Sequence, residues 1–76
     1  MAAKRSPANR ALGRTLRLAR EERGYSQEAF AAHAALDRAN YGAIERGEFN
    51  VTVDTIVKLA AGLGISASEL FRRAGL

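Results

Sequence analysis

Apolar residues along this chain recur every three or four positions, and no stretch alternates as a half-buried strand does. Short polar turns separate these periodic segments, which predicts a series of short helices. The residues expected to face the core are Leu12, Leu16, Ala19, Phe30, Ala31, Ala34, Tyr41, Ile44, Val53, Ile56, Leu59, Ala60, Leu63, Leu70 and Phe71. The expected fold class is therefore all-α, a compact arrangement of five helices.

Helix boundaries are marked by residues that cap or end helices. A side chain able to cap an N-terminus precedes each periodic segment: Ser6 (followed by Pro7), Ser26, Asp37, Thr52 and Ser66. Glycines that predict helix ends follow three of the segments, at Gly24, Gly47 and Gly64. The predicted helices are joined by short turns, and the longest connection is residues 47–51.

The turn at residues 34–36 is short enough to make the helices on either side cross steeply, as in a helix-turn-helix. The expected unit spans residues 26–46. In that motif the second helix enters the DNA major groove by its N-terminal end. Its outward residues would be Arg38, Ala39, Gly42 and Ala43. Arginine can bond both acceptors of a guanine, and alanine can contact a thymine methyl.

Length and composition narrow the classes of protein. A chain of 76 residues supports one core, so we expect a single domain over residues 1–76. The absence of cysteine excludes disulfides, zinc fingers and thiol catalysis. No apolar stretch approaches the roughly 20 residues that span a bilayer. We expect a cytoplasmic protein with no membrane partner.

The formal net charge is +4, and the excess lies in residues 1–25, which hold seven cations and two anions. Ten of the twelve cations are arginine, whose planar guanidinium suits phosphates and base edges. Solubility explains this charge equally well. Residues 1–6 are expected to form a flexible basic arm, and whether it reaches a minor groove is left open.

Nothing in the pattern indicates catalysis, a metal or a cofactor. His33 has neither cysteine nor clustered carboxylates beside it, so a surface position is expected. The serines precede or begin helices rather than forming a nucleophile elbow. We therefore expect no enzyme, no metal and no cofactor.

Two segments resemble the lambda-repressor-like, or XRE-type, helix-turn-helix regulators. Residues 25–31 (YSQEAFA) are similar to the family motif LSQEELA, and residues 44–47 (IERG) to its IERG. The runs at 36–41 (LDRANY) and 44–52 (IERGEFNVT) resemble those of restriction–modification controller proteins. The resemblance covers residues 12–71, most of the chain.

The resemblance implies roles for matching positions. Base edges would be contacted by Arg38, Ala39 and Ala43. The DNA backbone would be contacted by Gln27, Asn40, Gly42, Arg46 and Asn50, and Gln27 could instead brace the third helix. Arg20 and Glu45 match the ion pair that ties the first helix to the end of the third.

Five positions depart from the family pattern, and two of them, Ala39 and Ala43, lack the polar side chains that read bases. Ala35 replaces the usual turn glycine, and a left-handed backbone there would cost about 1 kcal/mol. Gly42 stands where a polar residue often contacts phosphate, and it costs about 1 kcal/mol inside a helix. Tyr41 replaces an aliphatic core residue, so its hydroxyl needs a partner or a route to solvent.

The expected function is a homodimeric, sequence-specific transcriptional regulator that binds a pseudo-palindromic operator and regulates its own gene. The expected dimer seam is built with the fourth predicted helix and contains Phe49, Leu70, Phe71 and Leu76, although Leu70 and Phe71 could equally be core residues. RNA polymerase is a further candidate partner. The alternative is an antitoxin-type module that binds a partner protein and also its own promoter.

Overall fold

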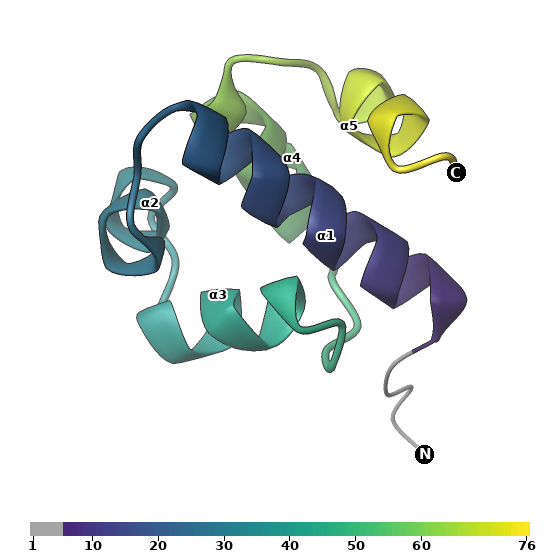
Figure 1. The fold of residues 1–76 in the computed structure, drawn as a ribbon, viewed down its shortest axis with the longest axis horizontal. Coiled ribbons are helices and arrows are strands. Elements are labelled where there is room, and N and C mark those ends of the chain that lie inside the picture. Colours follow the sequence, from purple (N-terminus) through teal and green to yellow (C-terminus); the bar gives the residue numbers. More distant parts are fainter. Residues whose placement is uncertain (1–5) are drawn as a thin grey trace.

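The computed structural model describes residues 6–76, and within that range it consists of five α-helices and no strand. They are α1 (Pro7–Glu22), α2 (Gln27–His33), α3 (Arg38–Glu45), α4 (Val53–Leu63) and α5 (Ala67–Arg73). The expected all-α, five-helix fold is confirmed. Of the predicted basic arm, residues 1–5 lie outside the described residues. In Figure 1, α1 crosses the middle of the molecule, with α3 on one side and α5 on the other.

The five predicted caps are all present. In each, the capping oxygen accepts a hydrogen bond of 3.0–3.1 Å from the backbone N–H three residues later. The pairs are Ser6 with Asn9, Ser26 with Ala29, Asp37 with Asn40, Thr52 with Thr55, and Ser66 with Glu69. Because each bond uses one of the N–H groups a helix start leaves unpaired, local sequence decides where these helices begin.

The turn between α2 and α3 keeps the left-handed backbone despite its alanine. Ala35 has φ +60°, and it is the one non-glycine with positive φ among the described residues. Two backbone bonds fix the turn, from Ala35 N–H to Ala32 O at 3.1 Å and from Leu36 N–H to Ala31 O at 2.8 Å. The turn therefore keeps its left-handed geometry, and the strain at Ala35 is retained in the native state.

Among residues 6–76, thirteen apolar residues form one core, to which every helix contributes. Two residues that were expected in the core, Val53 and Phe71, are exposed instead. Val53 is 77% exposed because it opens α4 beyond the packed part of that helix, and Val51 in the preceding connection packs against the core. Phe71 is 37% exposed because its neighbour Leu70, fully buried, occupies the inward side of α5.

Gly13 lets α1 and α3 cross closely, and sequence reasoning did not single it out. A Cβ at this position would lie 2.4 Å from the Glu45 backbone oxygen and 2.5 Å from that of Ile44. No side chain fits between the helices there. The crossing sets the position of α3 relative to the rest of the molecule.

Candidate nucleic-acid interface

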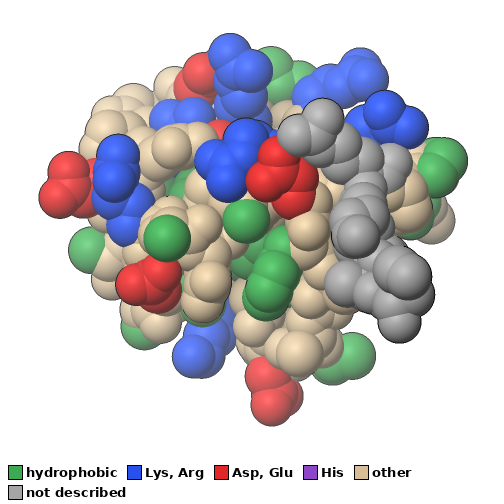
Figure 2. Space-filling model, turned by 90° about the horizontal axis from the view of Figure 1, so that it is seen from below, with side chains coloured by type: hydrophobic (Ala, Val, Ile, Leu, Met, Phe, Trp, Pro, Cys, Tyr) green, Lys and Arg blue, Asp and Glu red, His purple; other side chains and the backbone are tan. Residues whose placement is uncertain are grey.

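The N-terminal end of α3 projects from the molecule. Arg38, Ala39 and Asn40 are exposed and Ala43 is half-buried, whereas Tyr41 and Ile44 are in the core. Figure 2 views the side on which α3 lies and shows small hydrophobic side chains near the centre of that face. Lys and Arg side chains gather mainly on one half of it. A helix with short side chains and one terminal arginine can approach another surface closely.

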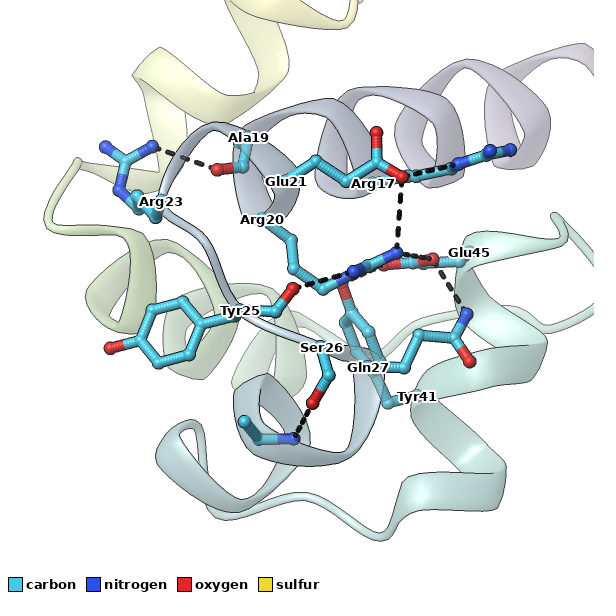
Figure 3. Close-up of polar contacts among 11 residues, drawn as sticks. Arg17, Ala19, Arg20, Glu21, Arg23, Tyr25, Ser26, Gln27, Tyr41 and Glu45 are labelled. Atoms are coloured by element: carbon cyan, nitrogen blue, oxygen red, sulfur yellow. Dashed lines mark hydrogen bonds and ion pairs between the residues drawn. The ribbon is translucent and has the colours of Figure 1, made fainter.

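The carboxylate of Glu45 holds α3 to α1 and α2. Arg20 donates from Nε to Glu45 Oε2 at 2.6 Å and from Nη2 to Oε1 at 3.1 Å. Gln27 Nε2 donates to the same Oε1 at 2.9 Å, and the Tyr41 hydroxyl donates to Oε2. Figure 3 shows these side chains converging between the three helices. Gln27 thus braces the third helix, one of the two roles expected for it.

Burial and these hydrogen bonds shift the pKa values of Glu45, Tyr41 and Arg20. Burial alone would raise the pKa of Glu45, but hydrogen bonds from Arg20, Tyr41 and Gln27 outweigh it, so that the pKa is lowered. Burial, reinforced by Glu45, raises the pKa of the Tyr41 hydroxyl. The hydrogen bond to Glu45 raises the pKa of Arg20. Glu45 is therefore ionised and Tyr41 protonated near neutral pH.

Gly42 was expected on the outward side of α3, but it is buried. The covering atoms come from other side chains. A Cβ at Gly42 would lie 3.2 Å from Arg46 Nη1 and 3.8 Å from Gln27 Oε1. Arg46 lies one turn further along and folds back over the glycine, while its Nε donates to Glu48 Oε1 at 3.1 Å. The sequence pattern could not reveal this cover because it depends on a side-chain conformation.

A shallow pocket of about 340 Å³ lies where α1, α2 and α3 meet. It is lined by Arg17, Arg20, Glu21, Gln27, Glu45 and Arg46. Arg17 pairs with Glu21 at 3.3 Å, and the side chains of Arg17 and Arg46 remain 63% and 57% exposed. Two exposed guanidinium groups thus border a polar hollow beside α3.

The connection after α3 is tied to the start of α1. Asn9 Nδ2 donates to Asn50 Oδ1 at 3.0 Å, across 41 positions of sequence. Asn50 therefore lies near the N-terminal end of α1 rather than beside Arg38.

Several large apolar residues remain exposed: Leu18, Phe49, Val53, Val57, Phe71 and Leu76. Three of the four expected seam residues are among them. Leu70 is fully buried in the core of its own chain, so it cannot contact a partner, and its assignment to the seam is corrected. Val57 was missed, although its position one turn after Val53 places both on one side of α4.

The described residues contain no group of three or more His, Cys, Asp or Glu side chains able to hold a metal. His33 is exposed, stacks on Tyr25 with ring centroids 5.1 Å apart, and has Nε2 3.2 Å from the Gly62 carbonyl oxygen. In the same part of the chain, no helix is long and apolar enough to cross a membrane.

Comparisons with known proteins agree with this geometry. A helix-turn-helix family model (HTH_3) matches residues 16–70. The control protein C.MunI of Mycoplasma sp is 49% identical over 55 residues, which are 72% of this chain and 74% of that protein. The control protein C.SmaI of Serratia marcescens is 38% identical over 65 residues, which are 86% of this chain and 77% of that protein.

The solved structures include the restriction-modification controller protein C.AhdI from Aeromonas hydrophila. It superimposes with a TM-score of 0.78 at 42% identity, covering 82% of this chain and 94% of that one. The chain therefore belongs to the XRE-type helix-turn-helix family of DNA-binding transcriptional regulators, and it is similar to the restriction–modification controller proteins of that family.

Proposed function

We propose that this protein binds a specific operator as a homodimer, with α3 of each subunit in a major groove. The observation that carries the proposal is the projecting start of α3, held from behind by the Glu45 cluster. A reading helix must keep its angle to the duplex, and a buried ion pair with two further hydrogen bonds supplies that rigidity.

Base edges are read chiefly by Arg38 in this proposal. Ala39 is exposed beside it and Ala43 is half-buried one turn later, where methyl groups can contact thymine. Only one side chain of this group can form a bidentate bond with a base. Sequence-dependent shape and deformability of the DNA then supply more of the specificity.

Backbone contacts surround these readers. We assign them to Gln27, Asn40, Arg46 and Asn50, and not to Gly42, which is buried beneath Arg46. Asn40 and Arg46 are exposed at opposite ends of α3, and Asn50 is exposed on the following connection. Such contacts fix the register of a protein on the duplex but carry little sequence information.

The proposed dimer seam consists of Phe49, Phe71 and Leu76, extended by the exposed valines of α4, Val53 and Val57. A two-fold pair would place two α3 helices on half-sites about 34–36 Å apart. Similarity to controller proteins supports regulation of the protein's own gene, with its own concentration as the input through dimerisation. RNA polymerase stays a predicted partner.

Replacement of Arg38 by alanine tests the reading role. Arg38→Ala should weaken binding to the operator by about 1–3 kcal/mol and relax the preference at one base pair per half-site. The measurement is a titration of operator and scrambled duplexes at a fixed salt concentration, with Lys58→Ala on α4 as the control for lost charge. Equal losses on both duplexes would show that Arg38 contacts only the backbone.

A further inference from the structure

Gly42 occupies the middle of the helix that the proposed function depends on, where glycine weakens a helix relative to alanine. The packing around Gly42 indicates what a glycine does at this position. Its missing Cβ leaves a slot on α3 that the end of Arg46 fills, with Nη1 3.2 Å from the position a Cβ would take.

An ion pair with Glu48 holds Arg46 at this slot, and Gln27 borders the slot. Arg46 Nε donates to Glu48 Oε1 at 3.1 Å, and Gln27 Oε1 lies 3.8 Å from the same Cβ position. Gln27 is fixed in turn through its Nε2 bond to Glu45. The Arg46 guanidinium is therefore oriented along α3 instead of extending freely into solvent, although the side chain remains 57% exposed.

We propose that Gly42 is a positioning residue, which allows Arg46 to place its guanidinium over α3 as the phosphate contact of this helix. The inference rests on the proposed DNA-binding function and deepens it. Arg46 borders the pocket at the α1–α2–α3 junction together with Arg17, which is paired with Glu21, so a phosphate there meets two exposed guanidinium groups and one exposed carboxylate. A guanidinium supplies the charge-assisted, paired hydrogen bonds that phosphate oxygens accept.

Side chains of increasing size at Gly42 test this role. Alanine forces the end of Arg46 to move slightly, because its Cβ would lie closer to Nη1 than an ordinary van der Waals contact allows, and leucine fills the slot. Both are strong helix formers, so each should raise the thermal midpoint of the folded chain, by roughly 4–8 °C for alanine. A residue with only a structural role would then leave DNA binding unchanged or improved.

We expect DNA binding to change in the opposite direction. Gly42→Leu should weaken binding to the selected operator about tenfold, the lower end of the value of a hydrogen bond to a charged group, and Gly42→Ala should weaken it less. The slope of log affinity against log salt should fall by about 0.9 for Gly42→Leu, as for the loss of one phosphate contact.

The decisive comparison repeats both substitutions in an Arg46→Ala background. There the slot has no occupant, so Gly42→Ala and Gly42→Leu should leave affinity and salt slope unchanged. Arg17→Ala is the matched control, because it removes an arginine from the same pocket but not from the slot, and its effect should add to that of Gly42→Leu.

Equal losses with and without Arg46 would overturn the inference, since Gly42 would then act by admitting the DNA itself. No loss in either background would also overturn it. The proposed function, and the inference with it, would be overturned if the wild-type protein bound no duplex, or bound every duplex with an affinity that does not depend on salt.

Discussion

At the scale of single residues, Ala35 shows strain retained in the native turn. Its φ of +60° costs an L-residue about 1–2 kcal/mol, whereas glycine adopts it freely. Replacing alanine by glycine also lowers the free energy of unfolding by about 0.4–1 kcal/mol, because glycine increases the conformational entropy of the unfolded chain. Ala35→Gly should therefore raise the free energy of unfolding by about 0.5–1 kcal/mol, measured by urea denaturation.

A matched control lies three residues earlier. Ala32 is exposed inside α2, so Ala32→Gly should lower stability by about 1 kcal/mol. If both substitutions destabilise the protein alike, the turn is not strained in the way its backbone angle indicates.

The Glu45 cluster predicts a pH dependence at the same scale. The pKa of folded Glu45 lies below its ordinary value of 4.5, so its stabilising contribution is present above pH 4.5. That contribution is lost as pH falls through the folded-state pKa. Tyr41→Phe removes one donor to the carboxylate, which costs about 1.5–3 kcal/mol at pH 7 and moves the folded pKa upward.

Acid denaturation of the Tyr41→Phe variant should consequently begin at a higher pH than that of the wild type. Tyr25→Phe is the control, because its hydroxyl points away from Glu45 (Figure 3). Circular dichroism between pH 7 and pH 2 measures both variants. Superimposable acid transitions for Tyr41→Phe and wild type would refute the role given to the Tyr41 hydroxyl.

At the scale of elements, local chemistry decided what could be predicted. All five helices and their caps follow from the sequence, because a cap and its N–H partner are only three residues apart. Val53 was misplaced because helical periodicity does not tell which end of a helix extends beyond its neighbours.

Less of the candidate site than of the helices could be predicted from the sequence. Resemblance to the family indicated the pairing of Arg20 with Glu45, but not the convergence of Gln27 and Tyr41 on one carboxylate, which depends on how three helices cross. The burial of Gly42 beneath Arg46 likewise depends on the conformation of one long side chain.

The crossing of α1 and α3 makes a prediction about these two elements. Gly13→Ala places a methyl group 2.4 Å from a backbone oxygen of α3, so the helices must separate. We expect a loss of about 1–3 kcal/mol in the free energy of unfolding, together with weaker DNA binding. Gly42→Ala is the same chemical change beside a movable side chain instead of a backbone, and it should stabilise the protein. Chemical denaturation of both variants checks this reversal of sign.

At the scale of the whole molecule, the exposed apolar residues predict association. A 76-residue domain buries a modest core, and contact between two copies would cover Phe49, Phe71 and Leu76. Phe71→Glu should shift the protein toward monomer in sedimentation experiments and weaken operator binding. Ala32→Glu, at an exposed residue of α2 outside the proposed seam, is the control. A monomeric wild type at micromolar concentration, or equal effects of both variants, would contradict the seam.

Selection of bound duplexes from a random pool, at a stated salt concentration, tests the central claim most directly. The account predicts enrichment of a two-fold symmetric site whose half-sites are centred about 34–36 Å apart. In the same selection, Arg38→Ala should lose the preference at one base pair of each half-site. A pool that shows no enrichment over random sequence would contradict sequence-specific recognition by this chain.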